Sequence, residues 1–187
     1  MAGKKDRHVF SKQDYDSNDG MMTSIWGPTM WHSLHCLSFN YPTNPSNKQK
    51  KDHANFIFSL GQVLPCRYCR ENFEENINSV GISNDVFKNR ATFSRFIYDL
   101  HEHVNTRLGK TSGLSYEDVQ DRYEAFRSRC LKSGEGGGPA PVPKKEKGCV
   151  EPMYTGKKSK CVLRIVPKES KRETFAMHPR CQLKKCE

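Results

Sequence analysis

The apolar residues in the middle of this chain recur at the spacing of a helix. The clearest run ends at Gly109 and consists of Phe93, Phe96, Ile97, Leu100, His101, Val104 and Leu108. Residues three and four positions apart lie on one face of an α-helix, and glycine often follows its last turn. No useful run before residue 160 alternates apolar and polar residues as a half-buried strand does. This spacing predicts an all-α fold.

The same spacing predicts the rest of a small bundle, four helices plus a short fifth, with short connections. Pro28 suits the first position of the first helix, where its missing N–H costs nothing. Ser115 suits the N-cap of the last helix, with Asp118 as an imperfect capping-box partner. The expected buried faces are Trp31, Leu34, His35 and Ser38; Ala54, Ile57, Leu60, Gly61 and Leu64; Cys66, Cys69, Phe73 and Ile77, in a helix that starts at Pro65; and Tyr116, Val119, Tyr123 and Phe126.

Charge and composition divide the 187 residues into three parts. The net charge is +10, and residues 131–187 carry most of it, with fourteen basic and six acidic side chains. That tail begins with a Gly/Pro-rich run at residues 133–143, which disfavours both helix and a packed core. We therefore expect a polar N-terminal arm at 1–21, a folded unit at 22–130, and a basic, largely irregular extension at 131–187.

Hydropathy argues against two classes of protein. The mean hydropathy is −0.82, and no stretch approaches the roughly 20 apolar residues that a membrane-spanning helix needs. The first residues of the chain show no apolar core of a secretory signal. We therefore expect neither a membrane span nor a secretory leader, and the eight cysteines leave the redox compartment open.

Two cysteines at the start of the third predicted helix concentrate the chemistry of the chain. Cys66 and Cys69 are separated by two residues, which places them on one side of the first helical turn. The N–H groups and positive dipole end of a helix stabilise a thiolate, and Arg67 and Arg70 add positive charge. In such a setting a cysteine pKa of about 8.5 can fall to about 7. A redox-active dithiol, half of a zinc site and a structural disulfide all fit the motif.

A zinc site needs two more ligands. His32 and His35 are three positions apart on one helix face, so they could complete a tetrahedral site with Cys66 and Cys69. His101 and His103 form a poorer pair, because residues two apart on a helix point about 200° from one another. A non-enzymatic Cys/His zinc or interaction module therefore remains the alternative function.

An aromatic and polar set on the predicted helices suits a flat heteroaromatic ring. Trp31 and His35 lie one turn apart, as do His101 and Asn105, and Lys110 follows the same helix. Aromatic faces stack on such a ring, while His, Asn and Lys bond its edge or a phosphate. For Trp31 or His101 alone, ordinary core packing is the simpler interpretation. The chain has no GxGxxG turn, so a nucleotide cofactor would be held without a Rossmann fold.

Four motifs follow one another along the chain. They are WGPTMWHSLH at residues 26–35, Tyr41 with Pro42, LPCRYCR at 64–70 and LHEHVNTRLGK at 100–110. In this order the motifs resemble the Erv/ALR family of FAD-linked sulfhydryl oxidases. The resemblance extends over residues 22–128 and is strongest to members encoded by large DNA viruses.

This resemblance implies that the bundle holds FAD and is usually a homodimer. It implies that Cys69 is the thiol next to the flavin and reduces it, and that Cys66 exchanges with the dithiol of a protein substrate. Dioxygen would take up the electrons as hydrogen peroxide, and no metal would take part. The family positions for FAD correspond here to Gly27, Trp31, His35, Tyr41, His101, Asn105, Leu108, Lys110 and Tyr123.

The resemblance also implies a location. The likeness to viral members implies the cytoplasm of an infected host cell or a virion. The cellular members of the family imply the mitochondrial intermembrane space as the alternative.

The sequence departs from the cellular members of that family at its disulfides. Many of them have a second, structural disulfide around the His-x-x-x-Asn helix end, where this chain has Tyr98 and Leu114. No cysteine precedes Cys36, so Cys130 lacks the partner that cross-links some cellular dimers, and a dimer would rest on packing. Cys36 points about 100° away from the preceding residue on the helix, and we expect it to be a small buried apolar residue.

The tail offers candidates for the shuttle dithiol that this family normally carries on a flexible arm. Its cysteines allow three pairings, and we favour Cys181 with Cys186 because their loop is short; the other two are Cys149 and Cys161. The alternative is a small stapled module around the strand-like run 161–166. The tail's net charge of +8 can attract nucleic acid or an anionic surface, whereas solvated disorder is the simpler interpretation.

The shuttle hypothesis predicts a selective defect. Replacing Cys181 and Cys186 together by Ser should slow the oxidation of protein thiols and leave the oxidation of a small dithiol unchanged. Oxygen consumption with each substrate measures both rates. Equal rates with the two substrates would exclude a shuttle at this pair.

Overall fold

The structure is a computed structural model, which describes residues 11–131, 148–153, 162–163 and 175–176. Every element between residues 12 and 124 is helical, so the predicted all-α unit is confirmed. The helices are α1 (Lys12–Asp16), α2 (Thr23–Phe39), α3 (Asn47–Val63), α4 (Arg67–Val80), the 3-10 helix η1 (Asn84–Phe87), α5 (Arg90–Arg107) and α6 (Tyr116–Glu124).

Side chains at the helix ends explain where the helices begin and stop. Ser46, Asn89 and Ser115 each accept a hydrogen bond from a backbone N–H in the first turn and form a capping box. The predicted Ser115 box, with Asp118 as its partner, is therefore present. Gly81 ends α4 with a φ of +86°, a left-handed conformation that favours glycine.

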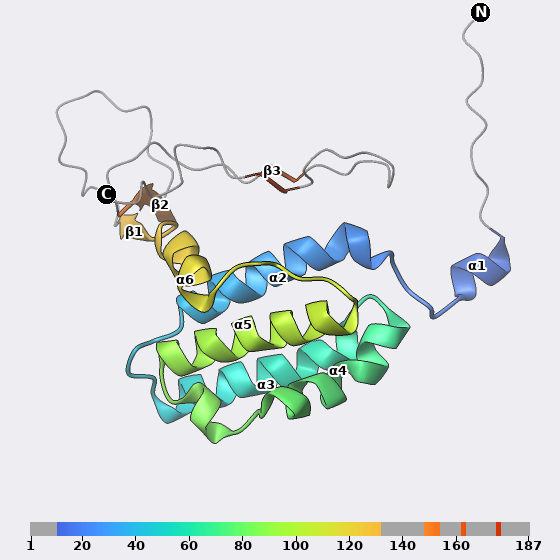
Figure 1. The fold of residues 1–187 in the computed structure, drawn as a ribbon, viewed down its shortest axis with the longest axis horizontal. Coiled ribbons are helices and arrows are strands. Elements are labelled where there is room, and N and C mark those ends of the chain that lie inside the picture. The colour runs from blue at the N-terminus through green and yellow to red at the C-terminus, as the bar shows by residue number, and fades with distance from the viewer. Residues whose placement is uncertain (1–10, 132–147, 154–161, 164–174, 177–187) are drawn as a thin grey trace, which may run out of the picture.

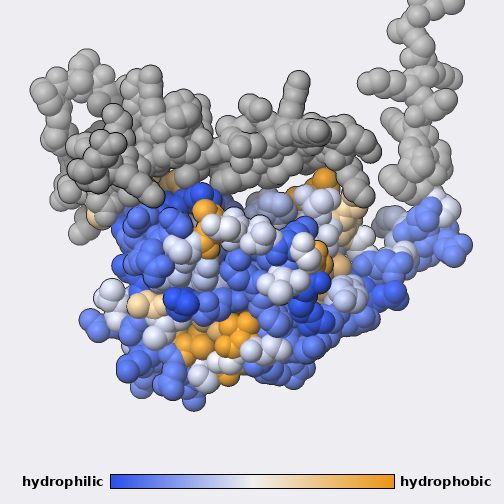
Figure 2. All heavy atoms as spheres, viewed as in Figure 1, coloured by the Kyte–Doolittle hydropathy of each residue, from blue (hydrophilic) through white to orange (hydrophobic). Residues whose placement is uncertain are grey.

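The four long helices enclose one core. In Figure 1, α5 lies between α2 and α4, α3 packs against α4, and α6 packs against α2. The buried apolar side chains are Leu34, Phe39, Tyr41, Ile57, Leu60, Leu64, Ile77, Val86, Phe87, Phe93, Phe96, Ile97, Leu100 and Val119. Figure 2 shows a mainly hydrophilic face with separate apolar patches. No helix among the described residues is long and apolar enough to span a membrane.

The start of α2 differs from the prediction. This helix begins at Thr23, so Pro28 lies inside it rather than at its first position. Proline removes one backbone donor from the helix. The helix continues through it, because the other hydrogen bonds of the first turns are made. The Trp26 indole N–H donates to the Met21 carbonyl at 3.0 Å, and the Ile25 N–H donates to Met22. These bonds extend the helix upstream of the proline.

The close contact of α3 with α4 places the cysteine motif. Gly61 is buried on α3, and a Cβ added there would overlap the ring of Phe73 on α4. Only glycine allows this approach. The chain then passes from α3 to α4 through Leu64, Pro65 and Cys66, so the cysteines lie at the end of a tightly packed helix pair.

Short strands follow the helical unit. β1 (Ser128–Leu131) pairs antiparallel with β2 (Gly148–Pro152), and β3 (Val162–Leu163) pairs with β4 (Phe175–Ala176). β1 therefore crosses the expected boundary at residue 130, and β3 lies within the strand-like run 161–166. Cys149 is disulfide-bonded. The other tail cysteines of the shuttle hypothesis, Cys161, Cys181 and Cys186, lie outside the described residues.

Aromatic side chains tie the turn after α5 back to that helix. The Tyr98 hydroxyl donates to the Leu114 carbonyl at 2.7 Å, and the hydroxyls of Ser94 and Tyr116 lie 2.8 Å apart. The Arg95 guanidinium lies over the rings of Tyr98 and Tyr116. Tyr98 and Leu114 are the residues at which the family resemblance led us to expect a departure from a second disulfide. A hydrogen bond joins this turn to α5 here.

This hydrogen bond makes a prediction about stability. Replacing Tyr98 by Phe should lower the free energy of unfolding by about 1 kcal/mol, because the Leu114 carbonyl loses its donor. Urea denaturation measures the change. Tyr15→Phe is the control, because Tyr15 is 85% exposed on α1 and its loss of a hydroxyl should cost nothing. The same stability for both variants would show that the bond does not hold the turn.

Candidate functional site

Cys66 and Cys69 occupy the N-terminus of α4. Cys66 is the N-cap residue in an extended conformation, so the helix starts at Arg67 and not at Pro65 as predicted. Its Sγ accepts a hydrogen bond from the backbone N–H of Cys69 at 3.2 Å. Both cysteines are half-buried thiols in this structure, and Cys69 packs against the hydrophobic core. The two cysteines therefore lie at either end of the first turn of α4, an arrangement in which a dithiol can form a disulfide.

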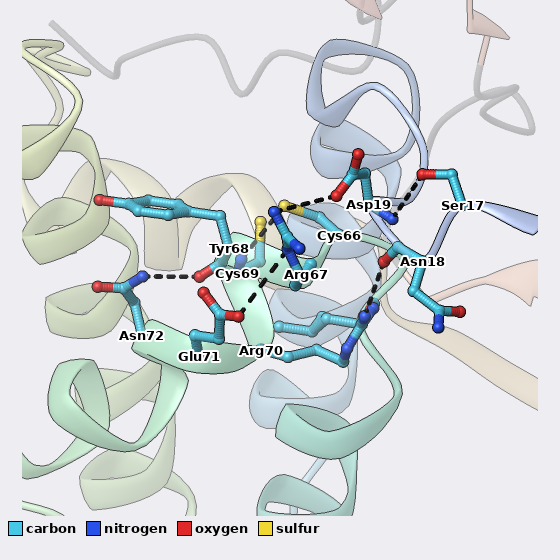
Figure 3. A network of polar contacts seen from close by, with 11 residues as sticks. Ser17, Asn18, Asp19, Cys66, Arg67, Tyr68, Cys69, Arg70, Glu71 and Asn72 are labelled. Carbon is cyan, nitrogen blue, oxygen red and sulfur yellow. Dashed lines mark hydrogen bonds and ion pairs between the residues drawn. The ribbon is translucent and has the colours of Figure 1, made fainter. Parts of the chain in front are cut away.

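The two arginines of this motif bind another segment of the chain. Arg67 forms ion pairs with Asp19 at 3.1 Å and with Glu71 at 3.9 Å. The Arg70 guanidinium donates to the carbonyls of Leu64 and Asn18. Figure 3 shows Ser17, Asn18 and Asp19 beside the start of α4. The arginine charges are thus partly neutralised or turned to carbonyl oxygens, rather than directed only at the sulfurs.

The electrostatics of Cys69 contradict the expected low-pKa dithiol. The pKa of the Cys69 thiol is raised to about 12, first by burial and then by a hydrogen bond with the neighbouring Cys66 thiol and its charge. The backbone N–H and Arg70 act in the opposite direction but are weaker. The contribution of Cys66 exists only while Cys66 is itself a thiol or thiolate. Once that sulfur enters a disulfide with another molecule, the Cys69 thiolate becomes easier to form.

A second cluster lies between α2 and α5. The rings of Trp31 and His101 stack with centroids 4.2 Å apart and planes 9° apart. His35 Nε2 lies 3.1 Å from His101 Nδ1, so one imidazole donates to the other. Trp31 and Cys69 pack against the same hydrophobic core. The residues that the sequence suggested for a flat ring, Trp31, His35 and His101, are therefore together.

Both imidazoles of this cluster are neutral at pH 7. Burial lowers the pKa of His35 to about 3, and the charges of His101, His32 and Arg122 act in the same direction. Burial also lowers the pKa of His101 to about 4, against a weaker opposing effect of Glu102. A neutral imidazole carries one N–H and one acceptor nitrogen. The cluster therefore offers hydrogen-bonding atoms without buried charge.

Two buried ring nitrogens, one of them in this cluster, lack a hydrogen bond within the described part of the chain. They are His35 Nδ1 and His103 Nε2. An unsatisfied buried polar atom costs about 1–3 kcal/mol, so such atoms usually have a bound partner. Because His35 Nε2 already contacts His101, its Nδ1 is the atom that remains for a ligand. An aromatic face can stack on the face of a flavin or adenine ring, and a nearby unsatisfied nitrogen can form a hydrogen bond to the edge of that ring.

Tyr123 extends this cluster from α6. Its ring stacks on Phe39 at 5.5 Å and lies 5.0 Å from the ring of His35. Its hydroxyl lies 3.1 Å from His32 Nδ1. The neighbouring Cys36 is exposed, with its Sγ 3.8 Å from His32 Nε2, so the expectation of a buried Cys36 is wrong. The rotation of about 100° per residue that separates it from buried His35 carries its side chain to the outer face.

The other residues suggested for a cofactor lie in different surroundings. Tyr41 is buried in the core, where its hydroxyl donates to the Phe87 carbonyl and its ring contacts Phe93. The Asn105 side-chain amide donates to the Glu102 carboxylate, and the Asn105 backbone carbonyl accepts from the Lys110 N–H. Gly27 is half-buried, and Leu108 and Lys110 are exposed. The contacts of Tyr41 thus separate it from the imidazole cluster.

The zinc alternative finds no support in the described residues. His32 contacts Tyr123 and His35 contacts His101, instead of meeting the two cysteines. Among the residues that the structure describes, no group of three or more His, Cys, Asp or Glu could hold a metal ion.

The protein is thus a helical bundle that carries two sites on one core. One is a dithiol at a helix start, and the other is a cluster of aromatic rings and neutral imidazoles. Residues 28–124 match the model of the Erv1 / Alr family, so the chain belongs to that family. The core of yeast Erv1 has a similar fold, with a TM-score of 0.50 at 23% identity over 63% of this chain and 96% of that one.

Relatives of known name share part of the chain. The protein named Probable FAD-linked sulfhydryl oxidase, from Acanthamoeba polyphaga mimivirus, is 30% identical over 56% of this chain and 72% of its own length. The mitochondrial FAD-linked sulfhydryl oxidase erv1 of Schizosaccharomyces pombe is 32% identical over 45% of this chain and 46% of its own. The family match at residues 28–124 covers the helices that carry the dithiol and the imidazoles.

One segment that contacts the backbone around Cys66 was not predicted from the sequence. We call residues 17–21 the N-terminal strap; the sequence suggested only a polar arm here. The Asp19-Gly20 pair is a common turn dipeptide, and it was a signal of local structure in this segment. His103, with its buried nitrogen, was weighed only as a zinc ligand.

The buried imidazoles make a prediction about pH. The folded-state pKa values of about 3 and 4 lie below the ordinary 6.5, so the unfolded chain binds protons that the folded protein does not. The stability due to neutral His35 and His101 is therefore complete above about pH 6.5 and is lost as the pH falls toward 4. We expect a loss on the order of a few kcal/mol for the pair.

Thermal unfolding followed by circular dichroism between pH 7.5 and 4.5 measures this loss. His101→Gln should flatten the decline, because one of the two groups no longer titrates. His53→Gln, whose ring lies by Tyr41 outside the cluster, is the matched control and should keep the wild-type slope. Identical slopes for the two variants would contradict the assignment.

Proposed function

We propose that this chain is a FAD-dependent thiol oxidase that forms disulfide bonds in protein substrates and passes the electrons to dioxygen, giving hydrogen peroxide. The observation that carries the proposal is the pairing of two sites on one core. A dithiol caps α4, and a neutral imidazole with an unsatisfied Nδ1 stands beside the Trp31–His101 stack. The named relatives are FAD-linked sulfhydryl oxidases, which supports the same activity.

The positions of the two sulfurs support different roles for them. Cys66 lies outside the helix as its cap, whereas Cys69 packs on the core. A substrate thiolate attacks Cys66 Sγ in the Cys66–Cys69 disulfide, so a bond forms between substrate sulfur and Cys66 while the bond to Cys69 breaks. Cys69 leaves with the electron pair, and the second substrate thiolate then displaces Cys66 and completes the substrate disulfide. Two protons pass from the substrate thiols to water.

The cofactor would be held by the α2–α5 cluster. Bound FAD supplies the two-electron acceptor that returns the dithiol to a disulfide and delivers the electrons to dioxygen. Trp31 and His101 offer stacking faces, and His35 Nδ1 offers a hydrogen bond to a ring edge. Lys110, just after α5, offers a charge for a phosphate. The proposed set is completed by Gly27, Asn105, Leu108, Tyr123 and Tyr41. Of these, Tyr41 would act only by supporting the core.

Three further proposals concern the assembly and its location. Exposed Phe56 and Val63, seven positions apart and so on one face of α3, provide apolar area for a second copy, which supports a homodimer. The shuttle role of Cys181 and Cys186, and a contact of the basic tail with nucleic acid or an anionic surface, remain proposals. The viral relatives favour the cytoplasm of an infected cell or a virion over the mitochondrial intermembrane space.

The test is oxygen consumption by the purified protein with a small dithiol. Wild-type protein should consume oxygen and release hydrogen peroxide, and Cys69→Ser should lower turnover on the order of 10³-fold while FAD stays bound. Cys36→Ser is the control, because this exposed thiol on the outer face of α2 takes no part in the exchange. Turnover by Cys69→Ser at the wild-type rate would refute the assignment of Cys69.

A further inference from the structure

The N-terminal strap, residues 17–21, pairs with the backbone on either side of Cys66. The Met21 N–H donates to the Pro65 carbonyl at 2.7 Å, and the Arg67 N–H donates to the Asp19 carbonyl at 2.8 Å. Together these bonds form an antiparallel bridge between Gly20 and Cys66. The exposed backbone edge at residues 65–67 is therefore already occupied by a piece of the same chain.

Gly20 stands directly opposite Cys66 in this bridge. The two hydrogen bonds flank the pair and do not join it, which is the antiparallel arrangement with the closest α-carbons, about 4.5 Å apart. The β-carbons of such a pair lie near the distance that a disulfide requires. A cysteine in an extended chain bound at this edge would thus lie opposite Cys66 and within reach of its sulfur.

Only glycine fits at the centre of the strap. Gly20 has a φ of +108°, and a Cβ there would lie 2.6 Å from the Pro65 oxygen and 2.8 Å from the Cys66 Cα. A substrate strand with an ordinary negative φ does not direct its Cβ into this backbone. The strap therefore places at this position a residue that has no thiol and cannot react with Cys66.

Side chains of α2 and α4 hold the strap in place. Arg67 pairs with Asp19, Arg70 donates to the Asn18 carbonyl, and Trp26 donates to the Met21 carbonyl. The Asp19 and Arg67 side chains are 70% and 61% exposed, so their ion pair contributes little to stability. The strap is thus held mainly by hydrogen bonds of its main-chain atoms, which the main chain of a competing strand can also make.

We propose that the strap is a substrate mimic that determines specificity: it occupies the backbone edge at which an extended, cysteine-bearing segment of a protein substrate binds as an added strand opposite Cys66. Strand addition of this kind recognises a peptide by its main chain and is a common mode of binding. The inference rests on the proposed function, because it assigns the substrate site of the same thiol exchange. A small dithiol has no backbone to pair and reaches Cys66 without displacing the strap.

The experiment compares three substrates in the full-length protein. They are dithiothreitol, an unstructured synthetic peptide with two cysteines, and the same peptide with an N-methyl group on the residue after each cysteine. N-methylation removes the donor that corresponds to the Met21 N–H and therefore prevents pairing with the Pro65 carbonyl. The variant is Gly20→Val, whose side chain cannot fit against Pro65 and releases the strap.

We expect Gly20→Val to raise kcat/KM for the unmodified peptide about fivefold to tenfold, the value of roughly one lost competing backbone interaction. The rates with dithiothreitol and with the N-methylated peptide should stay within twofold of wild type. Gly81→Val is the matched control: Gly81, which follows α4, also has a positive φ, but nothing lies within 4 Å of its Cβ position. This control should change none of the three rates selectively.

Hydrogen exchange of the Arg67 and Met21 amides provides a readout independent of activity. Both amides should be protected in the wild type and exchange faster in Gly20→Val. Unprotected amides in the wild type, or protection that persists in the variant, would overturn the strap geometry. An equal change with all three substrates, or a slower reaction of the unmodified peptide, would overturn the substrate-mimic role. Failure of the wild type to oxidise dithiothreitol would instead refute the proposed function.

Discussion

The hydrogen bond between His35 and His101 is the interaction on which the site depends. It joins α2 to α5 through two side chains whose burial keeps them neutral. Because the bond uses Nε2 of His35, the other nitrogen of that ring is left buried without a hydrogen bond among the described residues. The same contact that closes the bundle thus creates a polar atom that a bound ring can satisfy. Stability and cofactor binding are coupled at this point.

The dithiol depends on a different constraint, the close packing of α3 on α4. Gly61 admits the ring of Phe73, and the short connection that follows puts Cys66 at the cap of α4. One orphan N–H of that helix end binds Cys66 Sγ, and another binds the strap. Cys66 Sγ therefore accepts a backbone hydrogen bond, while Cys69 packs on the core. This division fits one sulfur for substrate and one for a buried acceptor.

The sequence predicted the features that follow from local periodicity and capping. The face of α5 from Phe93 to Leu100 and the box at Ser115 are examples, because spacing and capping chemistry act over a few residues. The motifs that resemble the family likewise predicted that Trp31, His35 and His101 lie together. Where tertiary contacts decide, prediction failed: burial sets the Cys69 pKa, and the hydrogen bonds of the first turn carry α2 past Pro28. The strap pairs residues some 45 positions apart through main-chain atoms, for which side-chain patterns carry no signal.

The visible absorbance spectrum of the purified full-length chain tests the central claim most directly, namely that the α2–α5 cluster is completed by a flavin. We predict a yellow protein with flavin absorbance equivalent to about one FAD per chain, which bleaches when a dithiol is added without oxygen and returns when air is admitted. A colourless protein that acquires no flavin absorbance when FAD is supplied would contradict the account.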